Sequence, residues 1–317
     1  MLALCIESSH LRGMGHLYRA LNLSDALAKA GISFVFYMNN HTPSRNILVD
    51  RGIPHEVVNL DDFTSNWEST LIKRDGLTLW VNDRLNTDIR HSEKIKASGI
   101  PLVTFDDRGT GASLADLHIA ALSFNVHEYL AGAKILRGLD YIILNPEISA
   151  HTRLRKELKS ILVTLGGSDT YGVTVKVVQM LKEIGLYATV VTGPSFMHAA
   201  QLEEELTSDF ILKRHVPSLI EEFYLHDLAI TGGGITPFEA TASGLPCVVI
   251  ANELFEIPVG KALRDLGCSV YSGYHEALCS PLFHPGLSLE QMSCTGIQRI
   301  GLQGTQRVLD ELVCLVA

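Results

Sequence analysis

Short apolar runs alternate with polar and amphipathic segments along the chain, and this pattern predicts an α/β fold. Runs such as 2–6 and 228–231 have the length of strands buried on both faces, whereas Leu17, Leu21 and Leu27 recur at helical spacing. Strands that alternate with helices are typical of a parallel sheet with βαβ crossovers. The expected strands are 2–6, 33–38, 56–60, 77–81, 102–105, 117–121, 141–144, 160–164, 187–191, 210–212, 228–231, 247–250 and 268–271. The expected helices are 16–30, 46–51, 173–184, 199–206, 218–225, 237–243, 259–266 and 302–316.

The pattern changes between residues 145 and 159, where the sequence NPEISAHTRLRKELK is polar and contains a proline. We place a domain boundary there, because an α/β pattern precedes it and another follows it. A length of 317 residues also suits two domains. The prediction is an N-terminal domain at 1–150 and a C-terminal, nucleotide-binding domain at 151–317. Two doubly wound halves would bind ligands at the carboxyl ends of their strands, in a cleft between them.

The segment 228–250, LAITGGGITPFEATASGLPCVVI, has the form strand, glycine turn, helix, strand. Gly232, Gly233 and Gly234 allow a ligand to approach the main chain, and Thr236 could cap the helix. A helix N-terminus behind such a turn is typical of a phosphate site, and Glu239 could reach a ribose. A tight connection without a ligand is the alternative.

A second glycine loop, GMGH at residues 13–16, follows the first strand. It lacks the third glycine of a dinucleotide fingerprint, because position 18 is Tyr, so no nicotinamide site is expected. Gly15 would approach the diphosphate, and His16 could act as general base, general acid or phosphate partner. A helix-capping or partly buried histidine remains an equal alternative.

Polar residues also follow other strands. Gly167 and Ser168, in LGGSD, suit a second phosphate contact, although an ordinary glycine turn with an aspartate cap fits as well. Asp106 and Asp107 end a strand, and we expect at most one to face the ligand, because neighbouring strand residues point to opposite faces. Asp106 is the expected catalytic carboxylate, and structural capping of the Gly109 turn is the alternative.

Net charge and the spacing of cysteines and histidines exclude several classes of partner and site. The net charge of -9 argues against nucleic acid or an anionic membrane as the main partner. The six cysteines form no CxxC pair and the histidines show no ligand spacing, so we expect reduced thiols, a cytoplasmic location, no metal and no cofactor. No segment has the length of a signal peptide core or of a transmembrane helix.

Taken together, GMGHLYRALNLSDAL, VTFDD, GLDYIIL, VTLGGSD and ITGGGITPFEATASGLPCVVI resemble one family. It comprises the UDP-sugar hydrolase of pseudaminic acid biosynthesis and related spore-coat polysaccharide proteins. The C-terminal half is more distantly similar to the peptidoglycan N-acetylglucosaminyltransferase that makes lipid II. The resemblance spans nearly the whole chain and implies the GT-B architecture, with two Rossmann-like domains and a cleft between them.

The resemblance also implies roles for individual positions. His16 is the implied catalytic base, and Glu239 is the implied ribose contact. The amides of Gly233, Gly234 and Ile235 would contact the diphosphate, and main chain near Val216 would read the base. Arg12, Asn82 and Glu256 would face the sugar. The chain departs from the hydrolases at 81–84, where they carry an aromatic residue, and at Glu256, where they carry Gln.

We therefore expect hydrolysis of a nucleotide-activated sugar, with a UDP-sugar as substrate and His16 as base. A glycosyltransferase that uses the same site with a sugar or lipid acceptor is the alternative, and a nucleotide-sugar sensor without turnover is a third possibility.

Overall fold

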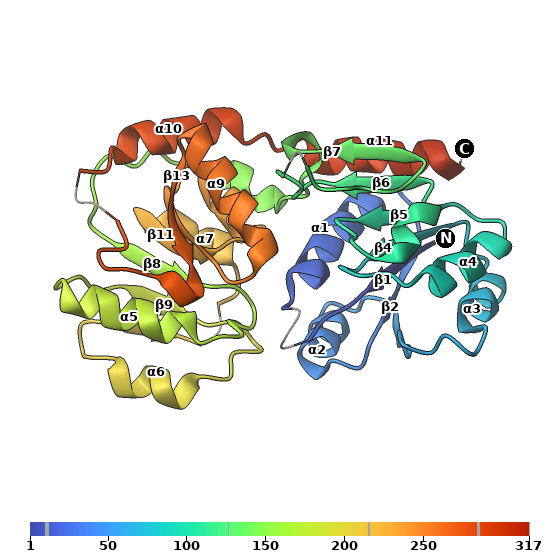
Figure 1. Cartoon of the computed structure of the whole chain (residues 1–317), viewed down its shortest axis with the longest axis horizontal. Helices are drawn as coiled ribbons and strands as arrows, with labels where there is room; N and C mark the ends of the chain where they lie inside the picture. The colour runs from blue at the N-terminus through green and yellow to red at the C-terminus, as the bar shows by residue number, and fades with distance from the viewer. Residues whose placement is uncertain (10–12, 126, 215, 284–285, 317) are drawn as a thin grey trace. The chain divides into compact units, whose positions relative to one another are not determined.

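A computed structural model of the chain describes residues 1–9, 13–125, 127–214, 216–283 and 286–316. The chain divides into two compact units, Met1–Ile143 with Gln303–Ala317, and Leu144–Leu302 (Figure 1). The first boundary lies seven residues before the predicted end of the N-terminal domain at 150. The predicted C-terminal domain, 151–317, also needs correction, because its last segment belongs to the N-terminal unit.

The N-terminal unit contains a seven-stranded parallel sheet in the order β3-β2-β1-β4-β5-β6-β7. Its strands are β1 (Leu2–Ile6), β2 (Phe34–Met38), β3 (His55–Val57), β4 (Leu79–Asp83), β5 (Leu102–Phe105), β6 (Leu117–Ala120) and β7 (Lys134–Arg137). Its helices are α1 (Gly15–Lys29), α2 (Thr42–Asp50), α3 (Trp67–Asp75), α4 (Ile89–Ala97) and α11 (Gly304–Val316). Alternation along the strands separates two cores: Leu4 packs with α1, and Cys5 packs on the opposite face with Trp80.

The C-terminal unit contains a six-stranded parallel sheet in the order β10-β9-β8-β11-β12-β13. Its strands are β8 (Ile161–Thr164), β9 (Thr189–Val191), β10 (Ile211–Lys213), β11 (Leu228–Gly232), β12 (Cys247–Ala251) and β13 (Ser269–Tyr274). Its helices are α5 (Val173–Glu183), α6 (Ala199–Glu205), α7 (Leu219–Leu225), α8 (Thr236–Ala242), α9 (Ile257–Leu266) and α10 (Leu289–Arg299). The central strands are buried along their whole length, as expected of a parallel sheet covered on both faces.

The final helix, α11, lies alongside β7 in the N-terminal unit (Figure 1). Val308, Leu309 and Leu312 enter the core that contains α1, and Lys134 of β7 forms an ion pair with Glu311 at 2.5 Å. The helix thus completes the first unit although it ends the chain.

Several predicted elements differ from the structure. The strand expected at 141–144 is wrong, because Leu139–Tyr141 forms a single 3-10 turn and the following residues are buried without pairing as a strand. The strand of this region is β7, which lies earlier and exposes most of its side chains. Helices α3, α4 and α10 were not predicted.

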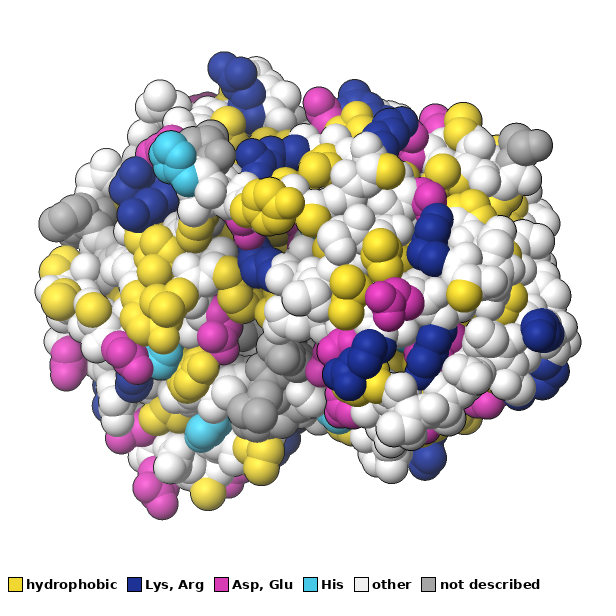
Figure 2. Space-filling view, turned by 45° about the vertical axis from the view of Figure 1, so that its right-hand side comes forward, with side chains coloured by type: hydrophobic (Ala, Val, Ile, Leu, Met, Phe, Trp, Pro, Cys, Tyr) yellow, Lys and Arg dark blue, Asp and Glu magenta, His cyan; other side chains and the backbone are white. Residues whose placement is uncertain are grey.

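Acidic and basic side chains are interspersed over the face drawn in Figure 2, with hydrophobic side chains scattered among them. Within the residues that the structure describes, no helix is both long enough and apolar enough to cross a membrane.

Candidate functional site

The carboxyl ends of β1, β4 and β5 lie next to one another at one edge of the N-terminal sheet. Helix α1 begins at this edge, so Gly15 and His16 stand in its first turn and Arg19 follows one turn later on the same face. Asp83 is the last residue of β4, and Asp106 directly follows β5. Parallel topology therefore brings four chemically active side chains from distant parts of the sequence to one place.

His16, Asp83 and Arg19 form a compact ionic cluster. The Nδ1 atom of His16 lies 2.6 Å from Oδ1 of Asp83, and the side chains are 15% and 5% exposed. Arg19 holds the same carboxylate with two donors, Nε to Oδ2 at 2.8 Å and Nη2 to Oδ1 at 2.5 Å. A bidentate pair of this kind fixes the orientation of the carboxylate as well as its charge.

The charge of Asp83 determines which nitrogen of His16 carries the proton. Burial acts to raise the pKa of Asp83, but the charge and hydrogen bonds of Arg19, together with His16, outweigh it and lower the pKa to about 2. At neutral pH the carboxylate is therefore ionised and can only accept, so Nδ1 of His16 must donate to it. In a neutral imidazole the lone pair is then on Nε2, which is the arrangement a general base needs.

The two neighbouring carboxylates of the VTFDD sequence have different partners. Asp106 pairs with Nη1 of Arg19 and accepts the amide of Leu122 at 2.8 Å, with a positive φ of 46°. Asp107 accepts the amides of Thr87 and Gly109, at 2.9 and 2.8 Å. Asp107 is thus the structural cap of the turn, and Asp106 joins the ionic cluster through Arg19.

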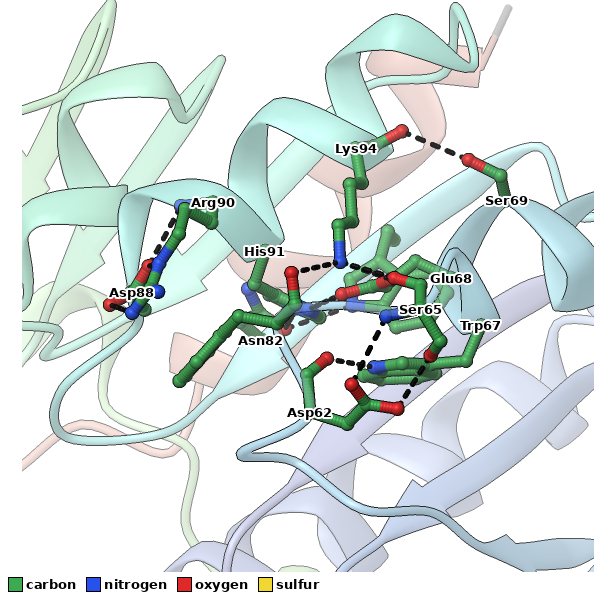
Figure 3. Close-up of polar contacts among 12 residues, drawn as sticks. Asp62, Ser65, Trp67, Glu68, Ser69, Asn82, Asp88, Arg90, His91 and Lys94 are labelled. Atoms are coloured by element: carbon green, nitrogen blue, oxygen red, sulfur yellow. Dashed lines mark hydrogen bonds and ion pairs between the residues drawn. The ribbon is translucent and has the colours of Figure 1, made fainter.

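Asn82, expected to face the sugar, lies instead in a buried polar network (Figure 3). As the neighbour of Asp83 on β4, it points to the opposite face of the sheet. Its Oδ1 accepts from the indole of Trp80 at 2.8 Å and lies 3.1 Å from Nε2 of His91. His91 contacts Glu68 through Nδ1 at 2.9 Å, and all these side chains are fully buried. Asn82 therefore has a structural role here, and we do not retain it as a sugar ligand.

The predicted nucleotide residues of the C-terminal unit gather at the carboxyl edge of its sheet. They come from loops after β8, β10, β11 and β12, which topology brings to one edge. Gly234, Ile235, Thr236 and Val216 are half-buried there. Helix α8 begins at Thr236 itself, with Ile235 before it, so the predicted capping by the Thr236 hydroxyl is wrong.

Steric room, rather than a positive φ angle, explains why glycine occupies these positions. None of Gly232, Gly233 and Gly234 has a positive φ. A Cβ on Gly233 would stand 2.6 Å from Cβ of Glu256, whereas a Cβ on Gly234 would meet nothing within 4 Å. Gly233 thus leaves room for the side chain of Glu256, and Gly234 leaves open space beside the main chain.

Glu256, also expected to face the sugar, binds main-chain amides of its own unit. Its Oε2 accepts from Asn252 at 2.7 Å and from Glu253 and Gly233 at 3.3 Å each. Burial raises the pKa of Glu256 to about 7 in spite of these bonds. The amide of Gly233, expected to contact the diphosphate, is thus engaged by Glu256 in this structure.

Glu239 lies one turn inside α8 and accepts the amide of Asn145 at 3.2 Å. Burial raises the pKa of its carboxyl to about 7, with a smaller contribution from the charge of Glu147. A carboxyl group that titrates near neutrality can exchange hydrogen bonds with hydroxyl groups in either protonation state.

The loop after β8 carries Gly167, Ser168 and Asp169. The Gly167 carbonyl accepts the amide of Ser195 at 3.0 Å, and Ser168 is buried. Asp169 accepts the amides of Val173 and Thr174 at 2.8 and 2.7 Å, which caps α5. The predicted aspartate cap is therefore present, and the loop is held from both ends.

Arg12, the remaining expected sugar contact, lies outside the described residues. Among the residues described, no group of three or more His, Cys, Asp and Glu side chains is arranged to hold a metal ion. Sequence reasoning missed Arg19 and did not select Asp83. The spacing of His16 and Arg19, three residues apart on one helix face, was the signal available.

Several solved structures share this architecture. MurG of Acinetobacter baumannii is 14% identical and superposes with a TM-score of 0.66 over 98% of this chain and 99% of that one. The glycosyltransferase SnogD of Streptomyces nogalater is 15% identical, with a TM-score of 0.61 over 100% and 99%. The rhamnosyltransferase SpnG, solved with thymidine diphosphate, is 14% identical, with a TM-score of 0.57 over 99% and 96%. The chain has the GT-B fold, and the predicted fold class is confirmed.

Two curated proteins are similar in sequence. An uncharacterized protein of Methanocaldococcus jannaschii is 28% identical over 277 residues, which cover 80% of this chain but only 56% of that protein. The spore coat polysaccharide biosynthesis protein SpsG of Bacillus subtilis is 25% identical over 291 residues, which cover 85% of this chain and 83% of that protein. No family model matches the chain.

Proposed function

We propose that this protein is a glycosyltransferase of glycan biosynthesis that moves a sugar from a nucleoside diphosphate, expected to be UDP, to a hydroxyl acceptor. The observation that carries the proposal is the contact of 2.6 Å between His16 and Asp83 within a GT-B fold. The polysaccharide role of the Bacillus subtilis relative and the glycosyltransferases among the structural neighbours support transfer better than the hydrolysis expected from the sequence.

In the proposed mechanism the N-terminal unit supplies the base. The Nε2 atom of His16 takes the proton of the acceptor hydroxyl while the hydroxyl oxygen attacks the anomeric carbon. The bond from that carbon to the diphosphate oxygen breaks, and its electron pair leaves with the diphosphate. Asp83 stabilises the imidazolium that forms, and Arg19, held by Asp106, keeps Asp83 in place. Asp106 thus acts through Arg19 rather than on the substrate.

The C-terminal unit holds the nucleotide in this proposal. Backbone amides near Gly234 and Ile235, with the loop at Gly167 and Ser168, bind the diphosphate, and the carboxyl of Glu239 binds a ribose hydroxyl. Main chain at Val216 contacts the base. The open space beside Gly234, where an added Cβ would meet nothing within 4 Å, supports this assignment.

The first test is nucleoside diphosphate release from a panel of UDP-sugars, with and without glycan acceptors. His16→Ala should lower turnover about 10²–10⁴-fold, the usual contribution of a general base, with UDP affinity unchanged. Asp83→Asn should also lower turnover, because an amide neither fixes the tautomer nor stabilises the imidazolium. Asp88→Asn is the matched control, since Asp88 is a half-buried carboxylate after β4 that pairs with Arg90 and not with the ionic cluster.

Turnover in His16→Ala equal to that of the wild-type protein would exclude His16 as the base. Rapid release that is the same with and without acceptor would restore hydrolysis as the better interpretation.

A further inference from the structure

Tyr171 connects the loop after β8 with the segments that follow β12 and β13. Its hydroxyl donates to Oε1 of Glu253, which lies after β12, at 2.9 Å. Its ring stacks on the imidazole of His275, directly after β13, with the ring centroids 4.2 Å apart and the planes 15° apart. In the sheet β11 lies between β8 and β12, so the contact from Tyr171 to Glu253 crosses the strand that ends in the glycine turn. We call the side chains of Tyr171, Glu253 and His275 the latch.

His275 is enclosed by the latch without hydrogen bonds to its ring. It is only 5% exposed, and the ring of Tyr274 meets it edge-on at 4.4 Å between centroids. Within the described part of the chain, neither Nδ1 nor Nε2 has a hydrogen-bond partner. A neutral imidazole carries one donor and one acceptor, and burying both without partners costs free energy. Contact with water would supply both partners, so the closed latch keeps His275 in an unfavourable environment.

The surroundings of His275 keep its ring uncharged while the latch is closed. Burial is the main cause that lowers the pKa of His275, and the charge of Lys176 adds to this effect. Lys176 comes from α5 and also donates to the carbonyl of His275 at 3.5 Å. Carboxylates from three segments act in the opposite direction without outweighing burial: Asp169, Glu253 and Glu276. The two neighbouring hydroxyl groups stay protonated at neutral pH because their pKa values are raised, those of Tyr171 and Tyr274.

We propose that the latch fixes the loop after β8 and opens when His275 takes up a proton, so that a nucleoside diphosphate binds less tightly at acid pH. The effect on the nucleotide rests on the proposed function, whereas the latch itself does not. On opening, the ring of Tyr171 leaves the imidazole, and both nitrogens of the imidazolium donate to water. Gly167 and Ser168, which precede Tyr171 in the same loop, then lose their tether to the segments after β12 and β13.

The direction of the pH effect follows from the lowered pKa. The closed latch binds the proton less tightly than an open latch, in which His275 has its ordinary pKa of 6.5. Stability of the closed form is therefore complete above that pH and is lost as the pH falls below it.

NMR titration of the histidine C2–H signals in the full-length protein, without ligand, tests the latch itself. The signal of His275 is the one that His275→Phe removes. In the wild-type protein it should titrate below pH 6.5, and Tyr171→Ala should raise its pKa towards that value because the ring becomes solvated. Tyr187→Ala is the matched control. Tyr187 is 43% exposed, close to the 41% of Tyr171, but precedes β9 at the opposite edge of the sheet, and its loss should not alter the titration.

UDP binding measured by calorimetry tests the effect on the nucleotide. Between pH 8 and pH 5 the dissociation constant of the wild-type protein should rise at least about three-fold more than that of His275→Phe, because phenylalanine keeps the stack and takes up no proton. The comparison cancels the titration of UDP. His55→Phe removes a histidine of the N-terminal unit and should keep the pH dependence of the wild-type protein. Tyr171→Phe keeps the ring but loses the bond to Glu253, and should weaken UDP binding about three-fold at pH 8.

A His275 titration that Tyr171→Ala leaves unchanged would overturn the latch. Equal pH dependence of UDP binding in the wild-type protein and in His275→Phe would overturn its effect on the nucleotide. A wild-type protein that binds no UDP at any pH would refute the proposed function, and the titration would still decide whether the latch exists.

Discussion

The polar network around His91 holds two protons whose locations follow from the neighbouring side chains. The indole N–H of Trp80 can only donate, so the Asn82 oxygen must face it, and the same oxygen lies 3.1 Å from Nε2 of His91. Nε2 therefore carries a proton. One more proton must lie between Nδ1 of His91 and Glu68, because otherwise a lone pair would face a carboxylate. The Glu68–His91 pair is thus neutral as a whole, which makes its complete burial tolerable.

This proton count predicts different outcomes for two substitutions of Glu68. Glu68→Gln can donate its amide to Nδ1 and should change the free energy of unfolding by less than about 1 kcal/mol. Glu68→Ala leaves Nδ1 buried without a partner and should cost about 1–3 kcal/mol. Urea unfolding followed by tryptophan fluorescence measures both, since Trp67 and Trp80 contact His91. Equal losses in the two variants would contradict the proton count.

The raised pKa of Glu239 predicts how the free energy of unfolding depends on pH. The folded-state pKa is about 7, against 4.5 ordinarily, so the folded protein binds the proton more tightly than the unfolded chain. Stability from this group is present below about pH 4.5 and is lost as the pH rises through 7. Glu239→Gln removes that loss while keeping an acceptor for Asn145. Relative to wild type, the variant should therefore gain stability between pH 5 and pH 8, on the order of 1 kcal/mol.

The matched control for Glu239 is Glu183→Gln, an exposed carboxylate at the end of α5. Its stability difference from wild type should be the same at both pH values. A difference for Glu239→Gln that is also independent of pH would show that burial does not raise the pKa of Glu239.

The candidate site was only partly predictable at the level of single residues. His16 and Glu239 stand next to glycine turns, which are visible in the sequence. Arg19 is not distinguishable from a surface residue of an amphipathic helix, because its partners Asp83 and Asp106 lie 64 and 87 residues away. Only the strand order, which places β4 and β5 beside β1, brings them together.

Helices α3 and α4 escaped prediction because their buried faces are partly polar. Glu68 on α3 and His91 and Ser92 on α4 are buried, so apolar residues do not recur with the helical period. Strand β7, KILR, exposes most of its side chains and lacks a continuous apolar run. Strands of the central sheets, whose residues are buried on both faces, were predicted within a few residues because their apolar runs are continuous.

Arg155 shows how the polar segment 145–159 is fastened to two helices. Its fully buried guanidinium donates to carbonyls at the C-terminal ends of α7 and α8, among them Phe223 at 2.5 Å and Ser243. A cation there also complements the helix dipoles. Arg155→Met should lower the free energy of unfolding by about 2–4 kcal/mol, because several carbonyls lose their donor at once. Denaturant unfolding measures this loss.

The control for Arg155 is Arg264→Met, which removes an arginine from an exposed pair with Asp265. Exposed pairs contribute about 0–1 kcal/mol, so this variant should remain close to wild type. Equal stability of the two variants would mean that the carbonyl contacts of Arg155 do not hold the segment.

At the scale of the whole molecule, the path of the chain couples its last helix to its first unit. Val308, Leu309 and Leu312 of α11 are part of the core formed by β1 and α1, although about 160 residues of the other unit intervene. The sequence shows that 302–316 is an amphipathic helix, but its apolar face would suit either sheet. Which unit it covers is decided by long-range packing, and this is why the predicted domain limits placed it wrongly.

This arrangement predicts that a change in α11 destabilises the N-terminal unit and spares the nucleotide loops. Leu312→Asp puts a carboxylate into that core and should cost the N-terminal unit about 3–5 kcal/mol. Both tryptophans of the sequence, Trp67 and Trp80, lie in that unit, so their fluorescence in urea reports its unfolding alone. Val313→Asp, at the next and exposed position, is the control and should leave the transition in place.

UDP affinity should change by less than about two-fold in Leu312→Asp under conditions where the protein is folded. If the tryptophan unfolding transition of Leu312→Asp stays where it is in the wild-type protein, α11 does not stabilise the N-terminal unit. If UDP binding is lost before the tryptophans report unfolding, the effect of α11 is not confined to the N-terminal unit.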